Sequence, residues 1–192
     1  MRPILLVGAA VLAGFAATSV SAHRAENDAG CNVRLSGLKM LTDPQRNLVN
    51  LLPKDTTVAR IDALPEPHPT PRTRSTPFSR QVWRVAAQIT EFKLEADGDI
   101  HLVLFDHNAY LVAEMPAATC IPTNARDRGA LVAVRKRFEA RCGKATDAWQ
   151  PLGAVVIISG VGFFDIPHSQ NPHAVNFAEL HPVTGLEIAA GC

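Results

Sequence analysis

The order of β-favouring runs constrains the fold of this chain more than any other feature. Short runs rich in Val, Ile, Phe and Thr recur after residue 80, separated by turn sequences and interrupted once by a helical stripe. The pattern predicts strands over 81–95, 100–105 and 110–115, a helix over 130–142, and strands over 154–164 and 177–188. The first strand is long enough to be bent or bulged midway, and Gly160 and Gly162 allow a sharp bend in the fourth.

Three strands, a helix and two further strands is the element order of the OB-fold, a partly open Greek-key barrel. We therefore expect a mostly β fold with one helix, arranged as a five-stranded OB-like Greek-key barrel (β-β-β-α-β-β). A small α+β sandwich is the alternative architecture. The barrel domain is expected to cover residues 80–192.

The N-terminal part of the chain has a different character. An apolar run over 4–17 follows Arg2 and leads through small residues to Val20-Ser21-Ala22, which is typical of a signal peptide over 1–22. The run is too short to span a bilayer comfortably, and no later stretch is long enough. We therefore expect a secreted or periplasmic protein with no membrane span in the mature chain. Residues 23–79 are expected to be irregular and proline-rich.

Four cysteines are present: Cys31, Cys120, Cys142 and Cys192. An even number in an exported chain predicts two disulfides, and their spacing leaves three pairings open. The sequence contains no Cys-x-x-Cys pair, which argues against a zinc site or a thioredoxin-like redox motif.

The charge balance limits the classes of partner. The formal net charge of +1 falls to about zero once Arg2 is removed with the leader, which argues against tight, non-specific binding of nucleic acid. Five aromatic residues could stack bases on a barrel face, although most should be core: Trp83, Phe92, Phe105, Phe163 and Phe164. The partner is therefore open among a glycan, a protein and a nucleic acid.

Two short blocks, over 95–104 and 179–183, carry the residues best suited to chemistry. Residues two apart in a strand point the same way, so Asp97, Asp99 and His101 are expected to share one face, as are Glu179 and His181. These five are the candidate catalytic or metal-binding residues. The alternative is structural, with the aspartates capping a turn and the histidines satisfied inside the barrel. No cofactor is expected other than a divalent metal, and no metal ligand is assigned.

The polar loop after the fourth strand supplies candidate binding residues. Asp165, His168 and Gln170 lie within it, and binding residues concentrate on such loops. The alternative is a solvated connection between two strands.

Combined, four blocks resemble a group of exported bacterial proteins of uncharacterised function. The blocks are K-x-E-x-D-x-D-x-H-L-V-L (93–104), A-E-x-P (113–116), G-V-G-F-F-D (160–165) and E-L-H-P-V (179–183). The resemblance covers roughly residues 81–188 and implies no established activity. It implies that Cys31 and Cys120 are the shared pair, which leaves Cys142 to pair with Cys192. The other pairing considered joins Cys120 to Cys142.

Two functional hypotheses follow from the sequence. The first is a secreted or periplasmic, non-catalytic binding or interaction module on a small β-barrel. The alternative is a divalent-metal-dependent, nuclease-like hydrolase that uses the five candidate residues. The Asp-Gly-Asp turn over 97–99 is faintly similar to staphylococcal-type nucleases, but no matching arginine pair surrounds it.

Overall fold

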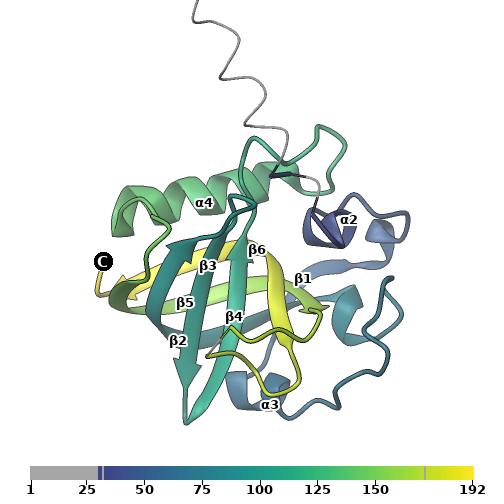
Figure 1. The fold of residues 1–192 in the computed structure, drawn as a ribbon, viewed down its shortest axis with the longest axis horizontal. Helices are drawn as coiled ribbons and strands as arrows, with labels where there is room; N and C mark the ends of the chain where they lie inside the picture. The colour runs from purple at the N-terminus through teal and green to yellow at the C-terminus, as the bar shows by residue number, and fades with distance from the viewer. Residues whose placement is uncertain (1–29, 32, 171) are drawn as a thin grey trace, which may run out of the picture.

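A mixed β-sheet with one long helix forms the body of the protein (Figure 1). The computed structural model describes residues 30–31, 33–170 and 172–192. The predicted signal peptide, residues 1–22, lies outside the described residues. Within the described part, no helix is both long and apolar enough to cross a membrane.

The sheet contains six strands in the order β1-β2-β3-β4-β6-β5, and β2 also pairs with β5. The strands are β1 (Asn50–Asp55), β2 (Gln81–Leu94), β3 (Ile100–Asp106), β4 (Ala109–Met115), β5 (Gln150–Phe164) and β6 (Ala178–Ala190). Most pairings are antiparallel, whereas β1–β2 and β4–β6 are parallel. Because the pairing returns to β2, five of the strands form a closed ring of hydrogen-bonded neighbours.

The prediction of five strands was wrong by one, because the sheet has a sixth strand, β1, which pairs with β2. Its residues are almost all exposed, so it lacks the alternation that marks a half-buried strand. Backbone pairing with β2, rather than side-chain burial, holds β1 in place. The predicted irregularity in β2 is confirmed, because the register of its pairing shifts between Ile89 and Glu91.

The long helix, α4 (Arg128–Cys142), packs against β6 and β4. It buries the predicted stripe of Leu131, Val134 and Phe138. The Phe138 ring meets Phe92 of β2 edge-on, with centroids 5.1 Å apart, which joins the helix to the sheet core. The helix therefore covers one end of the ring (Figure 1).

The segment over 23–79 is predicted to be irregular, yet its described part contains further elements. Besides β1 it contains α2 (Ser36–Lys39), α3 (Val58–Asp62) and the 3₁₀ turns Arg46–Leu48 and Phe78–Arg80. Arg74, in the basic stretch after the prolines, is only 1% exposed. Its guanidinium donates to Asp43 Oδ2 at 2.8 and 3.0 Å and to the carbonyl oxygens of Leu38 and Ser79. Arg74 therefore anchors the segment to the domain.

Both predicted disulfides are present. Cys31 pairs with Cys120 and Cys142 with Cys192, the pairing implied by the family resemblance. The first bridge ties the N-terminal segment to the loop after β4, and the second ties the end of α4 to the C-terminus. Each closes a loop of 50 or more residues, so each is expected to stabilise the fold by about 2–4 kcal/mol.

Gly162 on β5 is in a position where no side chain fits. A Cβ atom there would lie 2.9 Å from the carbonyl carbon of Phe78, and closer still to its oxygen. We predict that Gly162→Ala lowers the free energy of unfolding by about 2–3 kcal/mol, because backbone must move to accept the methyl group. Urea denaturation measures the loss. The control is Gly129→Ala, which places a methyl group in open space on α4 and should be neutral or slightly stabilising; equal effects of both changes would contradict the prediction.

Candidate functional site

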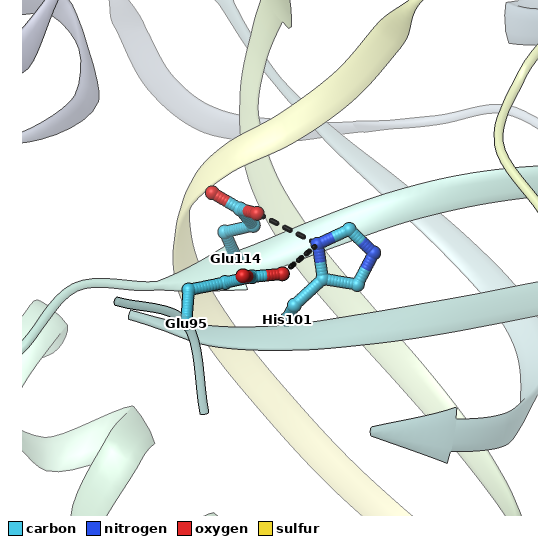
Figure 2. A group of neighbouring side chains, drawn as sticks. All are labelled: Glu95, His101 and Glu114. Carbon is cyan, nitrogen blue, oxygen red and sulfur yellow. Dashed lines mark hydrogen bonds and ion pairs between the residues drawn. The ribbon is translucent and has the colours of Figure 1, made fainter. Parts of the chain in front are cut away.

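Glu114 on β4 is the residue around which the buried charged side chains gather. It stands opposite His101 in the antiparallel pairing of β3 with β4, so the two side chains share one face of the sheet. His101 Nδ1 lies 2.8 Å from Glu114 Oε1 and 3.5 Å from Glu95 Oε1 (Figure 2). Both partners of the shorter contact are buried, with exposures of 2% for His101 and 6% for Glu114.

His181 on β6 reaches the same carboxylate from the other side. Its Nδ1 lies 2.9 Å from Glu114 Oε2, and its Nε2 lies 3.3 Å from Asp99 Oδ2. Neither contact has the directionality of a strong hydrogen bond, so attraction between charges dominates. The two sequence blocks therefore meet through Glu114, with both histidines buried. We call Asp99, His101, Glu114, His181 and Lys39 the Glu114 network.

Three members of the network, Glu114, His181 and Lys39, have pKa values shifted toward the charged form in spite of burial. Burial and the charge of Lys39 lower the pKa of His181, but the contacts with Glu114 and Asp99 outweigh them and raise it well above its usual range. Burial raises the pKa of Glu114, but the charge of His181 and the contacts with His101 and Lys39 hold it well below its usual range. The surroundings of His181, with Glu114 at Nδ1 and Asp99 at Nε2, therefore favour its imidazolium form.

Lys39, at the end of α2, supplies a second buried cation. Its Nζ lies 3.7 Å from Glu114 Oε2 and 5.8 Å from the centroid of the Phe163 ring. Burial lowers the pKa of Lys39, but the surrounding carboxylates, led by Glu114, raise it by more than burial lowers it. The net shift is upward, so the ammonium stays charged. Through Lys39, the N-terminal segment thus supplies a positive charge to the carboxylates buried in the sheet, Glu114 first among them.

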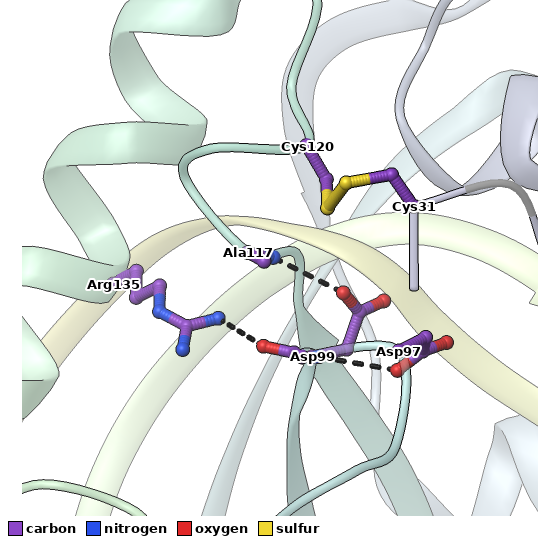
Figure 3. Close-up of a disulfide and its surroundings, with 7 residues drawn as sticks. Cys31, Asp97, Asp99, Ala117, Cys120 and Arg135 are labelled. Atoms are coloured by element: carbon purple, nitrogen blue, oxygen red, sulfur yellow. Dashed lines mark hydrogen bonds between the residues drawn. A yellow bond between two sulfur atoms is a disulfide. The ribbon is translucent and has the colours of Figure 1, made fainter. Parts of the chain in front are cut away.

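The turn between β2 and β3 is held by its own aspartates. Asp97 Oδ1 accepts from the Asp99 amide at 3.1 Å, and Asp99 Oδ1 accepts from the Ala117 amide at 3.1 Å (Figure 3). Gly98 has a φ of 85°, which suits glycine at the tip of this turn. Arg135 of α4 donates to the carbonyl oxygens of Gly98 at 2.7 Å and of Met115 at 3.1 Å. Asp97 and Asp99 therefore cap the turn by accepting hydrogen bonds from backbone amides, which is the structural role considered for them in the sequence analysis.

A polar pocket of about 280 Å³ opens over the outer side of the network. Its lining contains four carboxylates and one lysine: Glu95, Asp97, Glu114, Asp165 and Lys39. His101, His168 and Gln170 complete its polar wall. The structure therefore brings two of the five candidate catalytic residues, Asp97 and His101, to the same pocket as the three candidate binding residues, whereas Asp99, Glu179 and His181 are buried and outside its lining.

The loop after β5 reaches across to the end of β2 at this pocket. Gln170 Nε2 donates to Glu95 Oε1 at 2.8 Å, and Lys93 Nζ lies 3.2 Å from the same oxygen. The backbone amide of Gln170 donates to His168 Nδ1 at 3.3 Å. This contact leaves His168 Nε2 as the protonated nitrogen of the neutral ring, 3.6 Å from Asp165 Oδ2.

Three trios among the described residues have donor atoms close enough to share a cation. They are Glu95 with His101 and Glu114, Asp99 with Glu114 and His181, and Asp165 with His168 and Glu179. In each trio at least one donor atom already faces a protein partner. A divalent ion would therefore have to displace an existing contact to bind.

Neither Glu114 nor Lys39 is among the five candidate catalytic or metal-binding residues predicted from the sequence. Glu114 carries a signal, because it lies in an apolar strand and in the shared A-E-x-P block. Lys39 carries none, since its segment has no periodic pattern and its partners lie more than 70 residues away. Proximity of a buried lysine to a distant strand depends on tertiary packing alone.

Glu179 on β6 is buried without a hydrogen-bond partner for its Oε2 atom. Burial and the nearby Glu114 charge raise the pKa of Glu179 from 4.5 to about 7. Because the folded chain binds this proton more tightly than the unfolded chain does, stability declines as pH rises through this interval. We predict that Glu179→Gln stabilises the protein by up to about 3 kcal/mol at about pH 8, with no gain below about pH 4.

Denaturant unfolding of the wild type and the variant across pH measures this difference. Glu187→Gln removes an exposed carboxylate from the same strand and should show no such pH dependence. If Glu179→Gln were less stable than the wild type at alkaline pH, the carboxylate would be favourable there and the prediction would be wrong.

Comparisons with known proteins leave the family open. No family model matches the chain, and no curated protein matches it. Among solved structures, the fold is similar to one described as "Crystal structure of a putative aspartyl-tRNA synthetase from Leishmania major Friedlin", with a TM-score of 0.45 and 10% sequence identity. The match covers 75% of this chain and 22% of that one, and a likeness this weak carries no functional argument.

Proposed function

We propose that this chain is a secreted or periplasmic, non-catalytic binding module built on an OB-like barrel, and that the polar pocket takes a compact cation. Two disulfides support an oxidising compartment. The closed ring of five strand pairings, with the long helix α4 between its third and fourth strands along the chain, supports the OB-like assignment. Membership of the exported bacterial group stays a prediction from the shared blocks.

The charge of the pocket lining is the observation that carries the proposal. The lining contains four carboxylates and one lysine, Lys39, which is paired with Glu114, while Lys93 pairs with Glu95 from outside the lining. Asp97 and Asp165 have no lysine or arginine within ion-pair distance among the described residues. A buried or half-buried excess of negative charge favours a positively charged ligand that can pair with it. Glu95 and Asp165 are half-buried, with side-chain exposures of 23% and 19%, and are suited to first contact with a ligand.

The state of the two buried histidines favours binding over catalysis. His181 has both ring nitrogens against carboxylates and no exposed surface, so it cannot exchange a proton with a substrate in the pocket. His101 Nδ1 is engaged by Glu114, and its Nε2 is buried, with the ring edge-on to Trp149. Among the described residues that line the pocket there is no Ser, Thr or Cys to serve as a hydroxyl or thiol nucleophile.

Nuclear magnetic resonance titration with putrescine tests the proposal, with succinate as the anionic control of similar length. Putrescine should shift amide resonances around the pocket, and succinate should not. Glu95→Gln and Asp165→Asn should each weaken putrescine binding roughly tenfold, because each removes a charge-assisted hydrogen bond. Glu187→Gln removes an equal charge outside the pocket and should leave the affinity unchanged. Equal binding of succinate, or no shift with putrescine, would overturn the proposal.

The metal-dependent hydrolase has a distinct signature in the same system. Mn²⁺, Ca²⁺ and Zn²⁺ would each be added alone, with thermal stability and cleavage of bis(p-nitrophenyl) phosphate as readouts. Stabilisation by a metal together with cleavage that Glu95→Gln abolishes would replace the binding module with the hydrolase. Binding of a metal without cleavage would identify the compact cation as a metal ion.

A further inference from the structure

A second pocket, of about 420 Å³, lies between α3, the proline-rich segment and the ends of β2 and β5. Its lining is mainly apolar and includes Ile61, Leu64, Phe78, Trp83 and Phe164. Its volume is within the range of pockets that hold small organic ligands. It shares no residue with the polar pocket, so nothing in the proposed function accounts for it.

The walls of this apolar pocket are held from outside, which keeps the space between them open. The Phe78 backbone sits against Gly162, and Trp83 Nε1 donates to the Phe78 carbonyl oxygen at 3.0 Å. The Phe78 ring packs against Phe164, with centroids 5.0 Å apart, and is stacked on Trp83 at 5.9 Å. These contacts fix the aromatic wall before any ligand arrives.

The opposite wall, α3, is fixed by the loop that precedes β6. Asn176 Nδ2 donates to the carbonyl oxygens of Ile61 and Leu64, each at 2.8 Å. The Val175 amide donates to Asp62 Oδ1 at 2.7 Å. Because the polar groups of α3 bond away from the pocket, only its apolar side chains and Arg60 face the space.

Among the described residues of the lining, Arg60 is the only charged one, and no carboxylate accompanies it. It makes no ion pair with any residue that the structure describes. Glu66, between two lining prolines, is paired with His68 instead. An apolar space with one cation at its edge is complementary to a molecule with an apolar body and an anionic head.

We propose that the apolar pocket binds a small amphipathic carboxylate, such as a fatty acid of medium length. The hydrocarbon lies against Phe78, Trp83 and Phe164, where it loses contact with water. The carboxylate pairs with Arg60 at the mouth. This chemistry is opposite in charge to that of the polar pocket, so the two sites are tested independently.

Trp83 offers a direct readout of occupancy. The chain has two tryptophans, so Trp149→Phe leaves Trp83 as the only one. In that background, decanoate should change the Trp83 emission saturably, whereas decylammonium should bind more weakly. Arg60→Gln should lower decanoate affinity by up to about fivefold, the range of a solvent-exposed ion pair, and leave 1-decanol affinity unchanged. Arg141→Gln, an exposed arginine on α4, is the matched control and should have no effect.

Filling the pocket tests its location. Leu64→Trp and Thr56→Phe each add a ring from a different wall, and each should abolish the binding of both decanoate and 1-decanol in a protein that retains its circular dichroism spectrum. Emission from the added tryptophan is avoided by following decanoate with isothermal calorimetry for Leu64→Trp. Unchanged decanoate binding in either folded variant, absence of a saturable response in the parent, or equal affinity for decylammonium would overturn the proposal.

Discussion

Replacing Arg74 with methionine should lower the free energy of unfolding by about 3–5 kcal/mol, the largest loss expected from a single exposed-looking position in the sequence. The guanidinium is 1% exposed and donates four hydrogen bonds, two to Asp43 and one each to Leu38 and Ser79. Methionine fills the space but leaves the Asp43 carboxylate, only 9% exposed, without its cation. An unpaired buried charge is far more costly than an absent pair.

Urea denaturation of Arg74→Met against Arg72→Met measures this effect. Arg72 lies two residues away and is exposed, so its replacement should change stability by less than about 0.5 kcal/mol. The double variant Arg74→Met/Asp43→Leu should recover part of the loss, because no unpaired charge remains. If Arg74→Met and Arg72→Met behaved alike, the N-terminal segment would not depend on this anchor.

Glu114→Gln should cost about 3–5 kcal/mol, because it leaves the His181 imidazolium and the Lys39 ammonium close together without the carboxylate between them. Glutamine keeps the shape of the side chain, so the loss reports charge and not a cavity. Lys39→Met should also destabilise the protein. The combination of the two should lose less than the sum, with a coupling energy of about 1–3 kcal/mol.

Thermal and denaturant unfolding of the two single variants and the double variant complete this cycle. Glu187→Gln serves again as the surface control. A loss below about 1 kcal/mol for Glu114→Gln, or strict additivity with Lys39→Met, would show that the three charges do not act as a unit.

The order along the chain of the strands β2 to β6 and of the helix α4 could be predicted because the sequence signals of these elements are local. Alternating burial along β2 and the buried stripe on α4 repeat at the periods of a strand and a helix. The two-residue spacing also predicted that Glu179 and His181 share one face of a strand. Both are buried on β6, and Glu179 Oε2 lies 3.6 Å from His181 Nδ1. The prediction that Asp97 and Asp99 share a strand face with His101 was wrong: β3 begins only at Ile100, so both aspartates belong to the turn before it.

The parts that could not be predicted depend on contacts between distant segments. The exposed strand β1 is recognised only by its backbone pairing with β2. Arg74 lies in a proline-dense, basic stretch that is typical of a solvated surface. It is buried because it pairs with Asp43, a residue that precedes β1 and lies 31 positions earlier in the chain. The sequence also left open whether the histidines form a site or a network. In the structure they contact one carboxylate from two strands, beneath a pocket that other residues complete.

The protonation state of His181 tests the account most directly, because the network requires a permanent imidazolium between Asp99 and Glu114. Long-range proton–nitrogen spectra of the chain labelled with nitrogen-15 in histidine would show it, with His181→Asn to assign the signal. We predict that both ring nitrogens of His181 stay protonated from about pH 6 to about pH 8, with or without putrescine. A neutral His181 ring, or one that loses its proton within this range, would contradict the account.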